Sequence, residues 1–385
     1  MLPKRVYAKI NLDNIKKNIE SVVKKFSGVT VMGIVKADAY GHGAPETALA
    51  MKGAGAGAFG VATVGEAVQL RHCGITEPVL VLGPVFKEDY RRAIENSITC
   101  TVFDASLAKE LSDAAESMGE RAKVFIKIDT GMGRIGFQPD SEGFEQVKSV
   151  FSNKALEIMG AFTHFACADS ADKTSALTQK SKFIEFTDRL IAEGFPLPVR
   201  HMYNSASIME LDGGYTGEMV RCGVMAYGLY PSEEVKRKYR LYPAMELKSS
   251  IAFIKDVGKD FTVSYGSTYR TDKPAKIATI PVGYGDGYPR YLSNRGEVLI
   301  KGRRCPIVGR VCMDQFMVDI SAVPGAVIGD EVTLIGSDSG ETITVEDIAD
   351  PAYRFNYEFC CLITGRVPRV YVKDGEIIKI QDPYA

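Results

Sequence analysis

The feature that most constrains the fold is an alternation of short β-rich runs with longer helix-like segments over about the first 230 residues. Segments of helical composition separate the runs, for instance at 66–72, 106–118 and 181–193. The β-rich runs are Val29–Val35, Ala58–Thr63, Val79–Gly83, Ile98–Phe103, Val124–Asp129, Ile158–Phe165, Val199–Tyr203 and Met219–Gly223. Together they predict an α/β fold of the (β/α)8 barrel type, in which parallel strands close on themselves.

A doubly wound open sheet is the competing α/β fold, because a GxGxxG string occurs at Gly55, Gly57 and Gly60. In a dinucleotide-binding fingerprint these glycines follow a strand and open a helix. Here they precede a β-rich run. The string is therefore in the wrong order, and the barrel is favoured.

Composition changes after a charged stretch, Pro231–Pro243, which reads as a linker. Beyond it, Gly and Pro turns separate short β-rich runs, and one short helix is expected near Val345–Ala349. The runs are Leu247–Val257, Phe261–Tyr265, Lys276–Val282, Glu297–Ile300, Val311–Ile320, Glu331–Ile335 and Arg369–Lys373. We therefore expect a barrel domain over residues 1–235 and a mainly β domain over residues 236–385.

Composition excludes several classes of function. The formal net charge is −1, so no basic field favours nucleic acid or an anionic membrane surface. No run of about 18 apolar residues occurs, so we expect no membrane-spanning segment. The eight cysteines include no CxxC pair, which argues against a disulfide framework or a structural metal site. Reduced thiols of this kind are typical of a cytoplasmic protein.

Polar residues at the carboxyl ends of barrel strands are candidates for chemistry, because the βα loops converge there. Lys36 directly follows the first β-rich run. One interpretation is a surface lysine whose stem covers apolar surface. The other is a desolvated amine at the barrel mouth, suited to Schiff-base formation. The lysine alone does not decide between them.

The fifth run leads into a glycine-rich segment, Lys127–Gly136, whose backbone can approach a ligand closely. Within it Arg134 can bind a carboxylate with two parallel hydrogen bonds. The sixth run ends near His164. A surface arginine in a βα turn and a hydrogen-bonded core histidine are the plain alternatives.

The seventh and eighth runs end in what reads as an anion site. Asn204 and Ser205 follow the seventh, and Arg221, Gly223 and Val224 lie at the end of the eighth. Barrels often bind phosphate with these two loops, although a helix N-cap at Ser205 is an equally good structural role. A lysine on the first strand facing such a cradle suits a barrel that carries pyridoxal 5'-phosphate (PLP).

Six motifs, taken together and in this order along the chain, resemble the alanine racemase family, PLP-dependent barrels with a C-terminal β domain. They are Val35–Gly43, Lys127–Gly136, Val220–Gly228, Val263–Gly266, Gly283–Tyr288 and Val311–Asp314. The resemblance covers essentially the whole chain. It implies a cytoplasmic homodimer that interconverts L-alanine and D-alanine, the latter a building block of peptidoglycan.

The resemblance also implies roles for single residues. Lys36 would carry PLP and act as the base on one face of the substrate. Tyr265 would be the base on the opposite face, supplied by the partner subunit. Arg221 would bind the pyridine nitrogen, with His164 behind it. Lys127 matches a lysine that is carbamylated in some members and positions Arg134.

The remaining expected site residues bind phosphate or substrate, or line the channel to the pocket. The cofactor-binding set is completed by Tyr40, Asn204, Ser205, Gly223, Val224 and Tyr357. Arg134 and the backbone of Met313 would hold the substrate carboxylate, and Tyr284 would act as a gate residue in the channel. No metal ligand is expected.

Three alternatives stay open. The first is a serine racemase or a racemase of broad specificity within the same family. The second is a PLP-dependent decarboxylase acting on basic amino acids, which would need acidic groups for the distal ammonium. The segment Gly283–Arg290 offers only Asp286 for that purpose. The third is a non-catalytic PLP carrier, which would have no reason to keep Tyr265 and the second domain.

Overall fold

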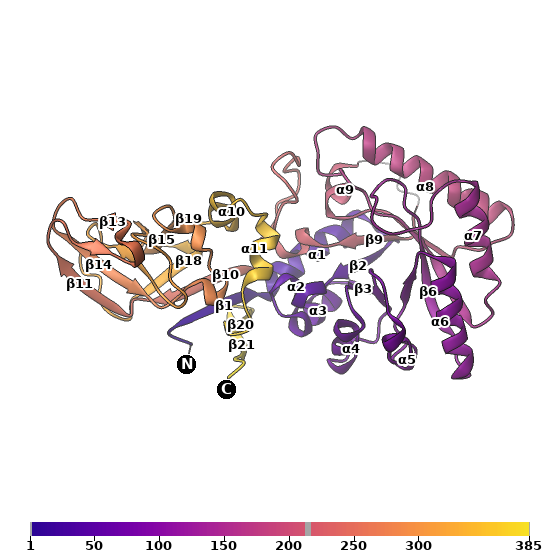
Figure 1. The fold of residues 1–385 in the computed structure, drawn as a ribbon, viewed down its shortest axis with the longest axis horizontal. Coiled ribbons are helices and arrows are strands. Elements are labelled where there is room, and N and C mark those ends of the chain that lie inside the picture. Colours follow the sequence, from indigo (N-terminus) through magenta and orange to yellow (C-terminus); the bar gives the residue numbers. More distant parts are fainter. Residues whose placement is uncertain (1, 212–216, 385) are drawn as a thin grey trace. The chain divides into compact units, whose positions relative to one another are not determined.

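The computed structural model describes residues 2–211 and 217–384, and the chain forms two compact units (Figure 1). The first unit comprises Ile15–Ala39 and Ala44–Tyr242. The second comprises Met1–Asn14, Tyr40–Gly43 and Pro243–Ala385. Each unit is built around its own sheets.

Among the described residues of the first unit, eight strands form two parallel four-stranded sheets ordered β4-β3-β2-β9 and β5-β6-β7-β8. A parallel bridge between Leu80 and Thr99 joins β4 to β5. At the other junction, Glu218 N donates to Arg200 O at 3.0 Å and Arg221 N donates to Tyr203 O at 2.9 Å. The strands thus close into the barrel that the sequence predicts. They are β2 (Thr30–Ile34), β3 (Ala58–Val61), β4 (Val79–Val81), β5 (Cys100–Val102), β6 (Ala122–Lys127), β7 (Leu156–Phe162), β8 (Val199–His201) and β9 (Met219–Cys222).

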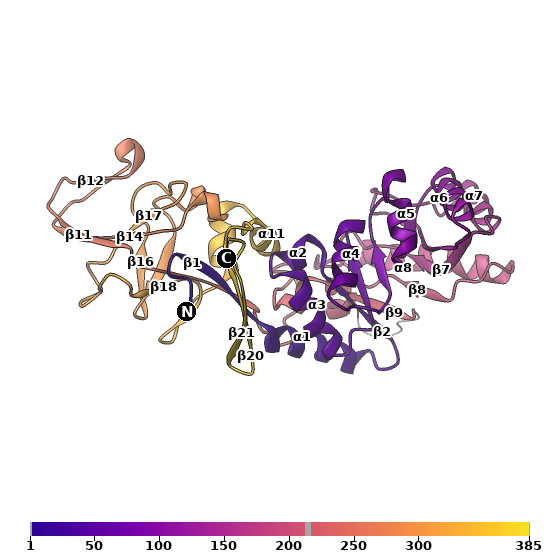
Figure 2. The ribbon, with the colours of Figure 1, turned by 90° about the horizontal axis from the view of Figure 1, so that it is seen from below.

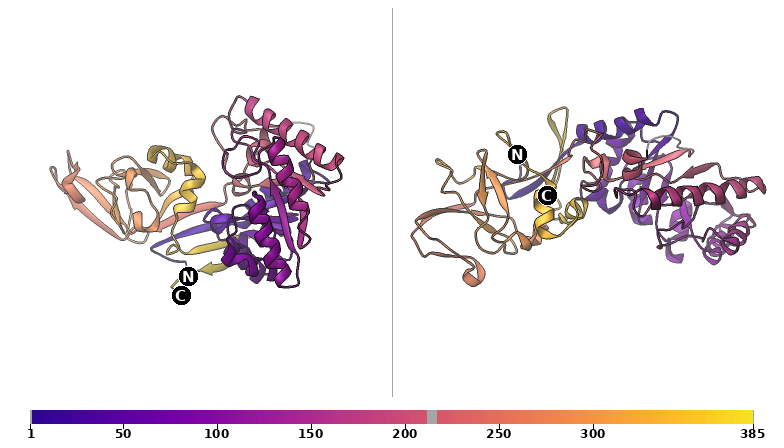
Figure 3. Two further views of the ribbon diagram at one scale, coloured as in Figure 1. Left: turned by 45° about the vertical axis from the view of Figure 1, so that its right-hand side comes forward. Right: turned by 90° about the horizontal axis from the view of Figure 1, so that it is seen from above.

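Helices surround these strands (Figures 1 and 3). In α6, the buried residues Ala108, Leu111 and Ala115 recur every three or four positions, so one stripe faces the strands. Thr63 opens α4 with a capping box to Glu66. The helices are α1 (Leu12–Lys25), α3 (Ala44–Gly53), α4 (Val64–His72), α5 (Lys87–Glu95), α6 (Ala105–Ser117), α7 (Ser141–Phe151), α8 (Thr174–Ala192) and α9 (Ser205–Glu210).

A bulge in β7 lets it fit between its two neighbours. Val124 of β6 lies opposite Ile158, but Phe125 lies opposite Gly160, so one residue of β7 is extra. Gly160 has a φ of +149°. A Cβ atom at this position would lie 1.7 Å from the carbonyl oxygen of Val199 on β8. Only glycine allows β8 to approach this closely.

The second unit is mainly β, as the sequence predicts. Its largest sheet has the order β16-β15-β18-β10-β1-β20-β21, with β19 paired to β18, and smaller sheets have the orders β11-β14-β17 and β12-β13. The strands are β1 (Val6–Asn11), β10 (Met245–Ser250), β11 (Phe253–Val257), β12 (Thr262–Val263), β13 (Tyr269–Arg270), β14 (Ala275–Ile280), β15 (Glu297–Ile300), β16 (Arg303–Pro306), β17 (Phe316–Asp319), β18 (Glu331–Asp338), β19 (Glu341–Ile343), β20 (Arg369–Lys373) and β21 (Glu376–Gln381). The helices α10 (Val345–Ala349) and α11 (Asn356–Leu362) complete it.

The compact units divide the chain differently from the expected boundary at residue 235. The N-terminal strand β1 runs antiparallel to β10 and parallel to β20, and Figure 2 shows it beside the hairpin of β20 and β21. Its backbone hydrogen bonds therefore place Met1–Asn14 with the C-terminal part of the chain. Tyr40–Gly43 joins the same unit, where Arg369 Nε donates to the carbonyl oxygen of Gly41 at 3.1 Å.

Several expected runs are shorter or broken. The run 247–257 is two strands, β10 and β11, and only Phe316–Asp319 of the run 311–320 is a strand. The expected helix at Val345–Ala349 is present as α10. Within residues 2–211 and 217–384, no helix has both the length and the apolar character needed to cross a membrane.

The close approach at Gly160 predicts a large effect of a single methyl group. We expect Gly160→Ala to lower the free energy of unfolding by about 3 kcal/mol or more, because β8 must move away from β7. Gly194→Ala is the matched control, since Gly194 also has a positive φ of 90° but no atom within 4 Å of the added Cβ. Its cost should stay at about 1 kcal/mol. Urea denaturation of both variants checks this, and equal losses would contradict it.

Candidate functional site

Lys36 lies at the end of the barrel where the strands terminate. It follows β2, which pairs in parallel with β9 so that Gly33 lies opposite Cys222. Lys36 lies two residues beyond the last residue of β2, and Gly223 and Val224 directly follow the last residue of β9. Parallel neighbours end at the same edge, so these residues belong to one end of the barrel.

The backbone after Lys36 has an uncommon conformation. Ala37, Asp38 and Ala39 have φ values of 51°, 51° and 54°, the left-handed region that costs an L-residue about 1–2 kcal/mol. Three hydrogen bonds hold it there: Ala37 N to Glu66 Oε1 at 2.7 Å, Ala39 N to Val35 O at 2.9 Å, and Ala44 N to Asp38 Oδ1 at 2.8 Å. Strain that surrounding contacts maintain in this way is characteristic of functional segments.

A buried arginine lies at the centre of the polar residues of this unit. Arg221, on β9, is 3% exposed. Its Nη1 donates to Nδ1 of His201 at 2.6 Å and to that residue's carbonyl oxygen at 3.3 Å. Its Nη2 donates to Nδ1 of His164 at 3.0 Å and to the carbonyl oxygens of Thr163 and Met202 at 2.8 and 3.1 Å. The guanidinium is therefore fixed by the ends of β7 and β8.

These contacts set the protonation of both histidines. A guanidinium only donates hydrogen bonds, so each Nδ1 accepts and each neutral ring carries its proton on Nε2. Burial, and then the charge of Arg221, holds the pKa of His164 and His201 well below the usual range. The His201 ring also stacks on Phe162, with centroids 4.9 Å apart. Both imidazoles are therefore neutral at physiological pH.

Lys127, at the end of β6, is a buried amine near the same charge. Its Nζ donates to the carbonyl oxygen of Ile128 at 2.8 Å. Burial, together with the charges of Arg221 and Arg134, lowers its pKa to about 7, although the charge of Asp129 opposes this shift. Around neutral pH a large share of Lys127 is therefore the uncharged, nucleophilic amine.

Asp129 shapes the loop that carries Arg134. Its Oδ1 accepts from the backbone N–H groups of Gly131, Met132 and Gly133 at 2.8–3.1 Å, and its Oδ2 accepts from that of Arg134 at 3.1 Å. Burial alone would raise the pKa of Asp129, but these backbone donors and Lys127 hold it below its usual value. The ionised carboxylate thus fixes the backbone of the loop.

The residues after β8 and β9 meet at a hydroxyl group. Ser205 Oγ accepts from the backbone N–H groups of Gly223 at 3.0 Å and Met225 at 3.4 Å. The N-cap of α9 is Asn204, whose side chain accepts from Ser207 N, so the N-cap role considered for Ser205 falls one residue earlier. Ser205 is therefore left in the first turn, between the starts of α9 and of the 3-10 turn Val224–Tyr227.

The other predicted site residues belong to the second unit, and three of them are held on neighbouring loops. Tyr265 is 72% exposed and follows Ser264, whose φ is 66° and whose Oγ donates to Arg310 O at 2.7 Å. Tyr284 N donates to Cys312 O at 3.1 Å, directly before Met313. The exposed side chains of Tyr265, Tyr284 and Met313 are thus tied to a single segment, 310–313.

The two remaining predicted residues of this unit lie on other segments. Tyr357 lies on α11 with its ring stacked on Phe355, the centroids 5.6 Å apart. Tyr40 belongs to the short segment Tyr40–Gly43, and its carbonyl oxygen is 2.9 Å from Nδ1 of His42.

Sequence reasoning missed His201, Asp129 and Glu66 as site residues. His201 ends a β-rich run, so its polar ring at a barrel strand end was the available signal. Asp129 precedes a glycine-rich turn, a common setting for a carboxylate that caps backbone N–H groups. Glu66 contacts Ala37 from 29 residues away, and no local pattern indicates that contact. Among the described residues, no group of three or more His, Cys, Asp or Glu side chains is placed to hold a metal ion.

Comparison with known families agrees with this arrangement. The family model "Alanine racemase, N-terminal domain" matches residues 10–231, and "Alanine racemase, C-terminal domain" matches residues 244–371. Alanine racemase of Clostridium perfringens (strain SM101 / Type A) is 44% identical over 378 residues, which is 98% of each chain.

Solved structures resemble the whole chain as well. That of alanine racemase from Clostridium difficile 630 has a TM-score of 0.95 at 38% identity and covers 99% of both chains. The structure of alanine racemase from Bartonella henselae, described with covalently bound pyridoxal phosphate, has a TM-score of 0.84 at 25% identity. It covers 96% of this chain and 100% of that one. With both domains matched along nearly their full length, the chain belongs to the alanine racemase family of isomerases.

Proposed function

We propose that this protein is a PLP-dependent racemase that interconverts L-alanine and D-alanine. The observation that carries the proposal is the buried Arg221, fixed between two neutral imidazoles at the same barrel end as Lys36. A guanidinium held there would donate a hydrogen bond to the unprotonated nitrogen of the cofactor's pyridine ring. The family's activity and the PLP named for the B. henselae relative support the same conclusion.

The residues present fit PLP. Lys36 would hold it covalently, and Arg221 would face the ring nitrogen. The Ser205 hydroxyl, with the backbone N–H groups of Gly223 and Val224, would hold the phosphate at the starts of two helical segments. Tyr40 and Tyr357 would add phenol groups, and Asn204 would fix the first turn of α9 through its capping bond. When bound, PLP withdraws electrons from the substrate Cα, which makes loss of the α-proton possible.

Racemisation needs a proton removed on one face of Cα and returned on the other. Lys36 would move the proton on one face, and the partner subunit's Tyr265 would move it on the opposite face. Arg221 keeps its own protons, because a guanidinium does not ionise at physiological pH. His164 and His201 accept from Arg221 through Nδ1, so they orient it without adding charge.

Arg134 and the partner subunit's Met313 would hold the substrate carboxylate, the arginine with its side chain and the methionine with its backbone N–H. The four backbone bonds to Asp129 fix the loop that carries Arg134. Beyond these contacts alanine has only a methyl group. Serine differs from it by one hydroxyl on that carbon, so serine is the competing substrate. Incubating the holoenzyme with each L-isomer and measuring both D-isomers and released carbon dioxide tests this assignment. We expect D-alanine to form faster than D-serine, without carbon dioxide.

Shared active sites predict complementation between two inactive variants. Lys36→Ala and Tyr265→Ala should each abolish racemisation. After unfolding and joint refolding, half of the dimers are mixed and each has one intact site, so activity should return to about a quarter of wild type. The matched control mixes Lys36→Ala with the double variant Lys36→Ala/Tyr265→Ala, which leaves no intact site. The alanine racemisation rate is the measurement, and no recovery in the first mixture would contradict shared sites.

Lys127 is proposed to form a carbamate that positions Arg134. Its neutral Nζ would attack the carbon of CO2, forming an N–C bond while the amine proton leaves to solvent. Arg221 and Arg134, the cations that lower the pKa of Lys127, would stabilise the resulting anion. The reactive neutral amine rises with pH, from about one tenth at one unit below that pKa to about nine tenths at one unit above.

Carbamate occupancy at constant dissolved CO2 should therefore rise steeply between pH 6 and pH 8. A carbon-13 resonance from labelled bicarbonate measures it in the folded holoenzyme. Lys127→Met is the control that should lack the signal. A signal that is absent at both pH values, or that persists in Lys127→Met, would contradict the assignment.

A further inference from the structure

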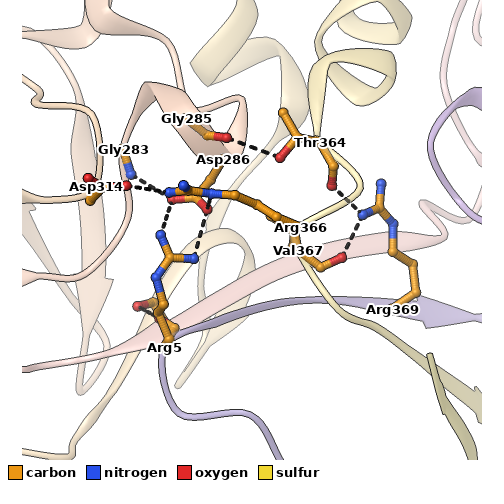
Figure 4. Close-up of polar contacts among 10 residues, drawn as sticks. Arg5, Gly283, Gly285, Asp286, Asp314, Thr364, Arg366, Val367 and Arg369 are labelled. Carbon is orange, nitrogen blue, oxygen red and sulfur yellow. Dashed lines mark hydrogen bonds and ion pairs between the residues drawn. The ribbon is translucent and has the colours of Figure 1, made fainter. Parts of the chain in front are cut away.

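Asp286 is a buried carboxylate bound by two arginines in the second unit (Figure 4). Arg5 makes two parallel hydrogen bonds to it, Nη1 to Oδ1 and Nη2 to Oδ2, both at 2.8 Å. Arg366 Nε donates to Oδ1 at 2.7 Å, and the backbone N–H of Gly283 donates to Oδ2 at 3.0 Å. Burial alone would raise the pKa of Asp286, but these four donors hold it below its usual value. The carboxylate is therefore ionised at neutral pH.

Arg366 links this carboxylate to a second one. Its Nη2 donates to Asp314 Oδ1 at 2.6 Å, so one guanidinium joins Asp286 and Asp314. Asp286 lies two residues after Tyr284, and Asp314 directly follows Met313. The bridge thus runs between the two segments that carry a proposed channel residue and a proposed substrate contact.

The same two segments touch through their backbones. Tyr284 N donates to Cys312 O at 3.1 Å, and Gly285 N donates to Met313 O at 2.9 Å. A Cβ atom at Gly283 would lie 2.3 Å from the carbonyl oxygens of Cys312 and Met313, so the contact leaves no room for a side chain. A small shift of either segment must therefore move the other.

A third segment, which carries Thr364 and Arg369, makes further hydrogen bonds to Gly285 and Asp286. Thr364 N donates to Asp286 O at 3.1 Å, and Thr364 Oγ1 donates to Gly285 O at 3.1 Å. Arg369 Nη1 in turn donates to Thr364 O at 2.7 Å. Buried charge of this kind is a weak source of net stability, since desolvation offsets most of the attraction. Its directional bonds do fix geometry.

We propose that Asp286 and Arg366 are positioning residues that hold Tyr284 and the backbone of Met313 in place for binding the substrate carboxylate. Arg5 binds both carboxylate oxygens of Asp286 and keeps that side chain oriented. The inference rests on the proposed function, in which the partner subunit's Met313 contacts that carboxylate. It assigns a role in binding to residues that do not themselves touch substrate.

The test uses Asp314→Ala, which removes the acceptor for Arg366 Nη2; the Asp314 side chain is 56% exposed, so the change leaves the buried cluster intact. In the holoenzyme we expect KM for L-alanine to rise about tenfold, as for one misplaced hydrogen bond to a carboxylate, with kcat within about twofold. Affinity for propionate, which is alanine without its amino group, should fall in parallel when measured by titration calorimetry. The thermal midpoint should match that of wild type.

Two further variants separate positioning from general stability. Arg366→Lys keeps the charge but lacks the planar guanidinium that bonds to both carboxylates, so it should resemble Asp314→Ala. Asp330→Ala is the control, since Asp330, like Asp314, pairs with a cation, here Lys301, and it accepts from the backbone N–H of Val327. It should leave KM and propionate affinity unchanged.

Unchanged KM and propionate affinity in Asp314→Ala would overturn the inference. So would a loss of binding that is explained entirely by unfolding of the variant, or by dissociation of the dimer in sedimentation at the assay concentration. If wild type itself forms no D-alanine, the proposed function fails instead. The wild-type assay therefore distinguishes the two failures.

Discussion

The buried guanidinium of Arg221 is the interaction on which the barrel site depends. Two imidazole nitrogens and three backbone carbonyls accept its hydrogen bonds, so its position follows from the ends of β7 and β8. Its charge acts in turn on its neighbours. It helps to keep His164 and His201 neutral and contributes to lowering the pKa of Lys127 to about 7. One fixed cation thus adds to the effect of burial on the protonation of three residues, and the surroundings favour an anionic ligand.

In both units, a residue proposed to be catalytic lies next to backbone with positive φ that hydrogen bonds hold in place. In the barrel unit, Lys36 is followed by a left-handed turn that Glu66 and Asp38 hold in place. In the second unit, Tyr265 follows Ser264, whose positive φ is maintained by a side-chain bond to Arg310. In each case side-chain hydrogen bonds hold a costly backbone conformation in place. Such support limits the freedom of the reactive side chain before any ligand binds.

Much of the fold could be predicted from the sequence because its signals are local. Barrel strands are short apolar runs between helical segments, and each of the eight expected runs overlaps a strand. The strand β1 could not be placed in this way, because its partners β10 and β20 lie more than 200 residues away. The hydrogen bonds between Arg5 and Asp286 could not be predicted for the same reason, because these residues are 281 positions apart in the sequence.

The candidate site was predictable only where residue type and strand end coincide. Lys36, Arg134, Ser205 and Arg221 each follow or end a β-rich run, so their shared edge could be expected. His201 also ends a run, but its role depends on the hydrogen bond from Arg221, which no motif encodes. The N-cap at Asn204 depends on a backbone dihedral angle, and a Ser or an Asn suits it equally well.

The central claim is that two different bases serve the two faces of the substrate. Racemisation of L-alanine in deuterium oxide, stopped at low conversion, tests it most directly. If Lys36 and the partner subunit's Tyr265 act on opposite faces, the D-alanine formed carries solvent deuterium at Cα, while the remaining L-alanine still carries protium. D-alanine that retains the original hydrogen would mean that one base serves both faces, and would contradict the account.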